Sequence, residues 1–268
     1  MERIKVIAQG PGIGDALWLT ALARNFKEQK NLGEVIAVTS HPEIFYNSKD
    51  CSGISFSDEC STPSEKTVHL SFDFKTHAID GYCHQLGLKP PFIRRNFIYL
   101  MVEEIEQARS KIHPSLRVIA IQSQAGPWTR NKDWDFLRFE EVVEHFRDKR
   151  FKFVQIGGRG DIRIEGCHDF FGTVRETAAI MSLCELFLGP ISAGMHLASA
   201  VGIPAVIIFG GREDPRCIAL DGHSTVTADV ECAPCWRVEP CQKGKICMNK
   251  ITSNMVIDIM EKEFSKAL

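Results

Sequence analysis

The chain has 268 residues, 44% of them hydrophobic and 25% charged, and its formal net charge at pH 7 is -2. This length allows one large or two modest domains with their own cores, and the composition is that of a globular protein. The small net charge gives no electrostatic reason to expect nucleic acid as a partner. Since no long apolar run and no signal peptide is present, we expect a cytoplasmic protein without a transmembrane segment, and peripheral membrane contact stays open.

The first part of the chain alternates between apolar strands and helices around a glycine-rich turn. The predicted elements are a strand over 5–8, a turn over 10–15, a helix over 16–30, strands over 34–39 and 68–72, and helices over 79–86 and 98–111. Strand, glycine turn, helix and strand in this order are typical of the beginning of a doubly wound α/β sheet.

A second series of the same kind begins near residue 112. It predicts strands over 117–122, 151–156, 169–171, 186–189 and 205–209, and helices over 137–147, 174–184, 193–201 and 253–267. Such alternation requires a mainly parallel sheet with helices on both faces. We therefore predict an α/β protein of two Rossmann-like domains that face a cleft, with domains over 1–112 and 113–252 and a C-terminal helix over 253–268. Ligands of such sheets bind beyond the carboxyl ends of the strands.

The first turn at such a strand end contains Gly10, Gly12, Gly14 and Asp15. Glycines at this spacing let the backbone approach a ligand closely, and the N-terminus of the following helix favours an anion. Asp15 occupies the place of the third glycine in a dinucleotide-binding fingerprint, where its charge would repel a pyrophosphate. Two interpretations remain: Asp15 caps the following helix, or it is a general base that accepts a proton from an attacking hydroxyl.

Polar loops follow two strands of the second series. They contain the candidate donor-binding residues Ser123, Arg130, Lys132, Trp134 and Gly157. Cations and hydroxyls at the carboxyl edge of a sheet suit a phosphate group, with Arg130 and Lys132 supplying positive charge. The alternative is a solvated surface loop, which is where charged residues usually lie.

The third motif, over 188–198, joins a buried strand to a helix of small residues. Ser192 is a good N-cap, and the backbone amides of Ala193 and Gly194 would be free to bind a diphosphate. Met195 and His196 follow in the first helical turn, and His196 would face the same space. The alternative for His196 is a core histidine bonded to a backbone carbonyl.

Together these motifs resemble glycosyltransferase family 9, the heptosyltransferase family of lipopolysaccharide assembly. The resemblance rests on the Gly-Ile-Gly-Asp turn, the Lys132-x-Trp134 loop, the Gly-Pro-x-Ser-x-x-Met-His-Leu-Ala run, and the Phe-Gly-Gly-x-x-Asp-Pro-Arg run that ends at Arg216. A cysteine pattern over 232–247 completes it. The motifs occur in the family's order over nearly the whole chain.

The resemblance implies the two-domain GT-B glycosyltransferase fold and an inverting sugar transfer, with ADP-heptose as the candidate donor. It assigns the catalytic base to Asp15, phosphate contact to Lys132 and donor binding to residues 192–196, with no metal required for the transfer. The chain departs from the family at Ile191, where relatives usually carry an acidic residue, and in its short N-terminal domain. Because that domain normally holds the acceptor, the acceptor stays open between a saccharide and a protein hydroxyl.

Four cysteines form the pattern C-x2-C-x5-C-x5-C, namely Cys232, Cys235, Cys241 and Cys247. A C-x2-C pair is the usual knuckle at one edge of a tetrahedral thiolate site, and two further cysteines complete four ligands. The cluster also resembles the iron-binding finger of autotransporter heptosyltransferases, which belong to the same family. We expect a structural iron or zinc here, with reduced or disulfide-linked cysteines as the alternative.

Two functions from different classes follow from these motifs. The first is an enzyme that moves a sugar from a nucleotide-diphosphate donor to a saccharide or protein hydroxyl, with Asp15 as its base. The second is a non-catalytic nucleotide-sugar binder, or a scaffold around a metal knuckle. The departure at Ile191 and the short N-terminal domain would favour the second function.

Overall fold

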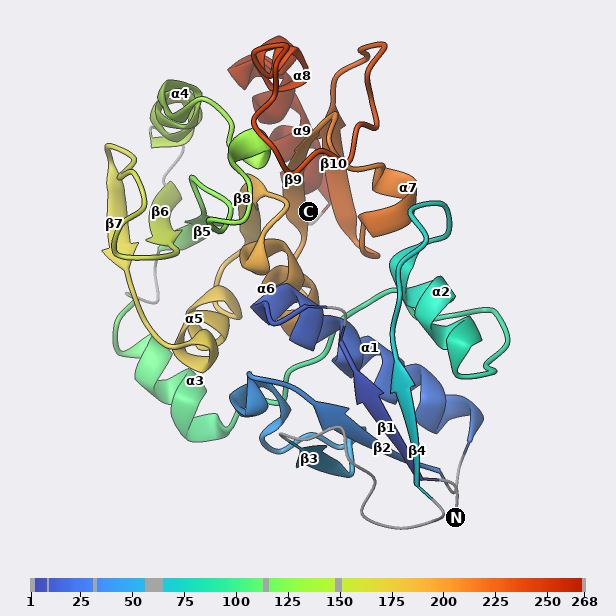
Figure 1. Ribbon diagram of the computed structural model, residues 1–268. Helices are drawn as coiled ribbons and strands as arrows, with labels where there is room; N and C mark the ends of the chain where they lie inside the picture. Colours follow the sequence, from blue (N-terminus) through green and yellow to red (C-terminus); the bar gives the residue numbers. More distant parts are fainter. Residues whose placement is uncertain are drawn as a thin grey trace. The chain divides into compact units, whose positions relative to one another are not determined.

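The computed structural model describes residues 3–8, 10–30, 33–55, 65–112, 116–147 and 151–266 (Figure 1). The chain divides into two compact units, the first made of Met1–Met101 and Arg216–Asp221 and the second of Val102–Pro215 and Gly222–Leu268. Each unit is organised around its own parallel β-sheet. The predicted α/β class with two Rossmann-like units is therefore confirmed.

In the described part of the first unit, a parallel sheet has the strand order β3-β2-β1-β4. Its elements are β1 (Arg3–Ile7), α1 (Ile13–Gln29), β2 (Glu34–Val38), the 3-10 helix η1 (Pro42–Phe45), β3 (Gly53–Ser55), β4 (Glu65–His69) and α2 (Ala78–Gln85). β1 pairs with two neighbours, so that Ile4 lies opposite Val35 and Lys66. The core of this unit includes the fully buried side chains of Val6, Leu17, Leu19 and Phe26.

The second unit contains, over its described residues, a parallel sheet in the order β10-β9-β8-β5-β6-β7. Its strands are β5 (Arg117–Ile121), β6 (Phe151–Ile156), β7 (Cys167–Phe170), β8 (Leu186–Pro190), β9 (Ala205–Gly210) and β10 (His223–Thr227). Its helices are α3 (Val102–Arg109), η2 (Arg130–Lys132), α4 (Phe136–Arg147), α5 (Val174–Met181), α6 (Ala193–Val201), α8 (Ile246–Lys250) and α9 (Ser253–Lys266). Every residue of β8 and β9 is buried, as expected for inner strands of a parallel sheet.

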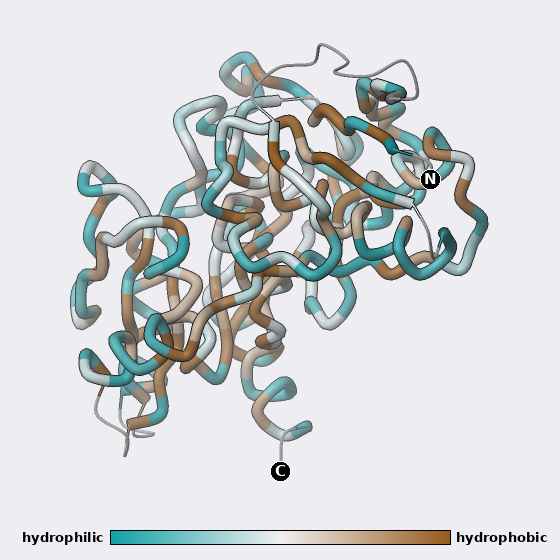
Figure 2. Tube along the Cα trace, turned by 90° about the horizontal axis from the view of Figure 1, so that it is seen from below, coloured by the Kyte–Doolittle hydropathy of each residue, from teal (hydrophilic) through white to brown (hydrophobic). Residues whose placement is uncertain are grey.

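Hydropathy follows this arrangement along the chain. In Figure 2, hydrophobic stretches gather in the interior and hydrophilic segments lie mostly at the periphery. None of the helices within the described ranges is both long and apolar enough to cross a membrane.

The helix predicted over 98–111 is α3, which is shorter than predicted and belongs to the second unit. The first unit accordingly ends at Met101 instead of at the predicted boundary of 112, and residues 113–115 lie outside the described residues. The physical reason is a bidentate ion pair between α3 and α5. Arg175 Nε and Nη2 donate to the two carboxylate oxygens of Glu104 at 2.6 and 2.7 Å.

The segment 216–221 belongs to the first unit, although its sequence neighbours on both sides belong to the second. The short helix α7 (Pro215–Ile218) begins at this crossing. Asp221 N donates to Arg94 O at 2.9 Å, and Arg94 N donates to Asp221 Oδ2 at 3.2 Å. His77 Nε2 lies 2.7 Å from Ala219 O. These bonds hold the segment against the first unit.

Two glycines of the second unit share a positive φ but differ in how closely other side chains pack around them. Gly210 and Gly222 both have a positive φ, of 62° and 80°. A Cβ on Gly210 would lie 2.5 Å from Met248 Sδ, whereas one on Gly222 would meet nothing within 4 Å.

We expect Gly210→Ala to lower the free energy of unfolding by about 3 kcal/mol, because backbone strain and overpacking add. Gly222→Ala should lower it by about 1 kcal/mol, since only the strain applies. Urea unfolding followed by circular dichroism measures both values. Equal losses in the two variants would contradict the close packing at Gly210.

Candidate functional site

The glycine turn of the first unit encloses the carboxylate of Asp15. Helix α1 begins at Ile13, earlier than predicted, and Asp15 Oδ2 accepts a hydrogen bond from Gly12 N at 3.1 Å. A Cβ on Gly10 would lie 2.7 Å from the same oxygen, and one on Gly12 would lie 3.0 Å from it. Glycine at these two positions therefore makes room for the carboxylate. Asp15 caps the helix from inside its first turn, with Gly14 beside it, instead of from the position before the helix.

Asp15 stays partly exposed while it caps the helix. Burial raises the pKa of Tyr82 well above its usual range, and the charge of Asp15 adds to this effect. The carboxylate therefore lies near the phenol of Tyr82. A carboxylate has about four lone-pair sites, so the bond from Gly12 does not by itself prevent it from accepting a proton.

The turn between β8 and α6 is closed by the side chain of Gln122. Ser192 takes the predicted N-cap position, but its Oγ donates to Gln122 Oε1 at 2.6 Å and makes no cap bond to the helix. Gly194 N donates to the same oxygen at 3.3 Å, so its amide is not free as predicted. Of residues 192–196, all of them described, Ala193 alone is not buried.

Gln122 also explains why this turn contains a glycine. A Cβ on Gly194 would lie 2.5 Å from Gln122 Oε1 and 2.6 Å from Phe187 Cζ, so a larger residue would displace both. Met195, next in the helix, is fully buried. Sequence reasoning missed Gln122, and only its place directly after a buried strand could have indicated it.

His196 is 6% exposed, so its side chain lies in the protein interior and does not face open space as the donor-binding interpretation expects. Burial, together with the smaller effects of the charges of His223 and Lys132, lowers the pKa of His196 to about 3. The imidazole is therefore neutral at neutral pH. The effect of Lys132 also shows that its ammonium lies near this helix.

Lys132 is held by a buried acid that sequence reasoning missed. Its Nζ lies 2.9 Å from Glu213 Oε1, and the guanidinium of Arg212 pairs with the same oxygen. The exposed fractions of the three side chains are 14%, 4% and 5%. Glu213 Oε2 is buried and has no hydrogen-bond partner among the described residues. One carboxylate between two cations leaves a net charge of about +1, which favours an anion such as phosphate.

Arg212 is fixed by further bonds and covered by an aromatic ring. Its Nε donates to Arg237 O at 2.6 Å, and its Nη2 donates to Trp236 O at 3.4 Å. The ring centroid of Trp128 lies 4.5 Å from Arg212 Cζ and 5.2 Å from Lys132 Nζ. The polar run directly after β9 was the signal in the sequence that could have pointed to Arg212 and Glu213.

Two predicted donor-binding residues have a structural role here. Ser123 is 2% exposed, and its Oγ donates to Ile162 O at 2.8 Å. Trp134 is 4% exposed, and its Nε1 donates to Ile251 O at 3.0 Å. Both side chains hold the loop after β5 to other parts of the second unit, and their bonding groups face protein.

The remaining predicted residues of these loops lie nearer the surface. Gly157 has a φ of 137°, and its turn is capped by Asp161, which accepts a hydrogen bond from Gly158 N at 3.0 Å. Arg130 has a side chain that is 60% exposed and lies 3.3 Å from the Asp133 carboxylate. Arg130 thus stays accessible at the surface, whereas Gly157 forms a local turn.

The four clustered cysteines are not arranged as the predicted metal site. In the described part of the chain, no group of three or more His, Cys, Asp or Glu side chains is placed to hold a metal ion, and the four thiols are free. Burial raises the pKa of Cys247, and the charges of Cys235 and Cys241 also raise it. These three thiols are therefore near one another, yet their arrangement does not fit the expected iron or zinc.

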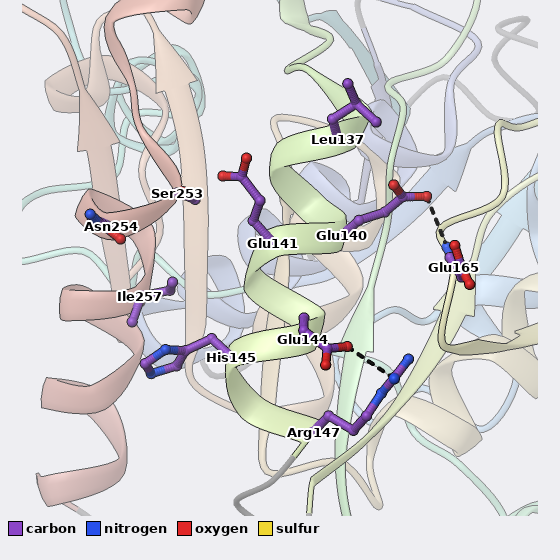
Figure 3. Close-up of a pocket in the computed structure, with 10 residues that line it drawn as sticks. All are labelled: Leu137, Glu140, Glu141, Glu144, His145, Arg147, Glu165, Ser253, Asn254 and Ile257. Atoms are coloured by element: carbon purple, nitrogen blue, oxygen red, sulfur yellow. Dashed lines mark hydrogen bonds and ion pairs between the residues drawn. The ribbon is translucent and has the colours of Figure 1, made fainter.

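A hollow of about 950 Å³ lies between α4 and α9 (Figure 3). Its lining is chemically unlike that expected of a donor-binding site. Its ionisable lining residues are Glu140, Glu141, Glu144, His145, Arg147 and Glu165. Figure 3 shows Glu141 and His145 pointing toward α9, with Glu140 and Glu144 on the other side of α4. Four carboxylates against one arginine would repel a diphosphate, and none of the predicted donor-binding residues lines this hollow.

No protein-family profile matches the sequence, and no curated protein matches it either. Solved structures do share its fold. ADP-heptose lipopolysaccharide heptosyltransferase II of E. coli is 11% identical, with a TM-score of 0.76 over 99% of this chain and 99% of that one. The family 9 glycosyltransferase of Veillonella parvula DSM 2008 is 15% identical, with a TM-score of 0.76 over 99% and 97%.

A third similar structure is TibC, an iron-containing dodecameric glycosyltransferase from enterotoxigenic E. coli H10407. It is 18% identical, with a TM-score of 0.77 over 99% of this chain and 77% of that one. TibC is also known in complex with ADP-D-beta-D-heptose. These likenesses confirm the predicted fold of two parallel-sheet units, as found in GT-B heptosyltransferases.

Two histidines of the second unit should make its stability depend on pH. Burial lowers the pKa of His223 to about 4, and among the described residues neither of its buried ring nitrogens has a hydrogen-bond partner. His196 has a pKa of about 3. An unfolded histidine binds a proton below about pH 6.5, whereas these two stay neutral in the folded state. Their contribution is therefore complete above that pH and is lost as the pH falls toward 4.

We expect the free energy of unfolding to fall by about 1.4 kcal/mol per pH unit for each histidine between about pH 6 and 4.5. His223→Phe should halve the contribution of these two histidines to the slope, from the uptake of two protons on unfolding to the uptake of one, because phenylalanine does not titrate. Urea unfolding at a series of pH values measures the slope. A slope unchanged in the variant would contradict the burial of a neutral His223.

Proposed function

We propose that this chain is a family 9 glycosyltransferase that moves a sugar from a nucleotide-diphosphate donor to a saccharide or protein hydroxyl. The observation that carries the proposal is the cluster of Lys132, Glu213 and Arg212 at the carboxyl edge of the second sheet. The shared fold with heptosyltransferases supports it, and the TibC complex supports ADP-heptose as the donor. In this proposal the second unit binds the donor and the first unit supplies the base for the acceptor hydroxyl.

The donor diphosphate would bind beside Lys132. The departing nucleoside diphosphate develops negative charge, which a preorganised cation stabilises. Glu213 is shared by two cations, so it fixes the position of the Lys132 ammonium without cancelling the positive charge. At the tip of α6, Ala193 is partly exposed and is the candidate for a backbone contact, since Gly194 N is engaged by Gln122. No metal is needed for this charge compensation.

The acceptor hydroxyl needs a base because an alcohol is a weak nucleophile. We assign this role to Asp15, whose carboxylate is partly exposed and oriented by Gly12 N. As the hydroxyl oxygen bonds to the anomeric carbon, the bond from that carbon to the diphosphate breaks and Asp15 takes the hydroxyl proton. Attack opposite the leaving group inverts the anomeric centre.

A non-catalytic nucleotide-sugar binder is the second candidate. Ile191 favours it, because this residue is 5% exposed and apolar at the position where family members usually carry an acid. The metal-scaffold version has less support, since the described cysteines do not assemble a metal site. A screen of nucleotide sugars by mass spectrometry, followed by transfer assays with the sugar that binds, separates a binder from an enzyme.

Asp15→Asn should lower the rate of transfer from ADP-heptose by about 10²- to 10⁴-fold, because the general base is lost. Donor affinity should stay unchanged. A coupled assay of ADP release measures turnover, and calorimetry measures donor binding.

The matched control is Asp161→Asn, which removes a carboxylate that caps a glycine amide in the second unit at a similar distance. This control should leave turnover intact. Full turnover by Asp15→Asn, or an equal loss in both variants, would refute the base assignment.

Glu213→Gln tests whether this acid positions Lys132. Simple charge counting predicts tighter ADP binding in the variant, because a negative charge is removed. If Glu213 positions the ammonium, the dissociation constant for ADP should instead rise about tenfold, and Lys132→Met should weaken binding at least as much. The exposed Glu239 provides the control Glu239→Gln, with unchanged affinity expected. Tighter binding by Glu213→Gln would refute the positioning role.

A further inference from the structure

A second concave site adjoins Lys132 in the same unit. It is a groove of about 460 Å³ between residues 127–131 and 238–245, within the size range of small-molecule sites. Apolar side chains form much of its lining, namely Pro127, Trp128, Val238 and Pro240. Arg130 and Lys245 add two positive charges, and its lining residues include no carboxylate.

The two walls of the groove are fastened to each other by side chains of one wall. Thr129 Oγ1 donates to Val238 O at 2.9 Å. Asn131 Nδ2 donates to Arg237 O at 3.2 Å and to Glu239 O at 2.8 Å. Asn131 Oδ1 accepts from Cys241 N at 3.0 Å. The groove is therefore formed before any ligand arrives, which reduces the entropic cost of binding.

Trp128 gives the groove an aromatic surface. Its exposed fraction is 62%, which is high for a large apolar side chain. Arg212 and Lys132 contact the ring but leave most of the residue uncovered. An exposed indole face packs well against the C–H face of a sugar ring, because both surfaces are apolar and flat.

Arg130 and Lys245 supply the charge complementarity. Arg130 Nη1 lies 3.3 Å from the carboxylate of Asp133, and because the Arg130 side chain is 60% exposed, the rest of its guanidinium is accessible to a ligand. Lys245 Nζ donates to Arg130 O at 3.4 Å and to Asp133 O at 3.0 Å. Because an ammonium has three N–H donors and carbonyls carry no net charge, two carbonyl partners leave one N–H and the full positive charge available to a ligand. Guanidinium and ammonium together suit a phosphate group.

We propose that this groove binds a phosphorylated saccharide, with the sugar ring against Trp128 and the phosphate between Arg130 and Lys245. Lys132 Nζ lies 5.2 Å from the Trp128 ring centroid, so the ligand lies beside the residue assigned to the donor diphosphate. Its use as part of the acceptor rests on the proposed function. Its binding does not, because it needs no donor.

The test is a calorimetric or NMR titration of the full chain with glucose 6-phosphate, without any donor. We expect a dissociation constant on the order of 1 mM, with glucose and inorganic phosphate each binding about tenfold or more weakly. Trp128→Ala and Lys245→Met should each weaken glucose 6-phosphate about tenfold, and Trp128→Phe should retain most of the affinity. Lys250→Met is the control, because Lys250 lies outside the groove and bonds to Asp229 O.

Trp128→Ala keeps the test decisive, because an exposed side chain can be removed without unfolding the protein, and a thermal melt checks this. Equal affinities for inorganic phosphate and glucose 6-phosphate would overturn the proposal, since the groove would then recognise only the charge of the ligand. Unchanged affinity in Trp128→Ala would overturn it as well. Sugar-phosphate binding without transfer to any acceptor would sustain the groove and refute the proposed function. Transfer to a phosphorylated acceptor whose KM is unaffected by Trp128→Ala would support the proposed function and refute the role of the groove.

Discussion

The carboxylate of Glu213 is the group on which the candidate site of the second unit depends. A buried carboxylate is costly unless cations and hydrogen bonds compensate its desolvation. Here Lys132 and Arg212 share that task, and they come from the loops after β5 and β9. Those strands lie on either side of β8, so the acid ties together two loops that are far apart in the sequence. The position of each cation is thereby fixed by the requirement to neutralise one buried charge.

The loop after β5 is also tied to the C-terminal segment that contains the cysteines. Trp134, Asn131 and Thr129 all donate hydrogen bonds to backbone carbonyls of residues 237–251. Arg138 Nη1 adds a bond to Met248 O at 3.3 Å. The cysteine segment therefore forms a wall beside Lys132. In this structure the segment stabilises the loop through its backbone carbonyls, which accept hydrogen bonds from the loop side chains, and not through a metal site.

The sequence was sufficient to predict both sheets, except for the edge strands β3 and β10, and the loops at their carboxyl edges, because period and turn residues are local signals. It could not show which polar residues of those loops bond within the protein. Ser123 and Trp134 have the residue types of a binding site, but their partners Ile162 and Ile251 are far away in the sequence. For the same reason Glu213 was missed, since its role depends on pairing with Lys132. Long-range partners decide the role of a polar residue, and one sequence does not reveal them.

The excursion of residues 216–221 into the first unit means that neither unit is a continuous piece of the chain. A protease cut or a gene break after Met101 would leave this stretch on the wrong fragment, separated from His77 and Arg94. Cys217 and Leu220, each 3% exposed, would then face water. Exchange of one half between related proteins would consequently require matched changes at two distant places in the gene.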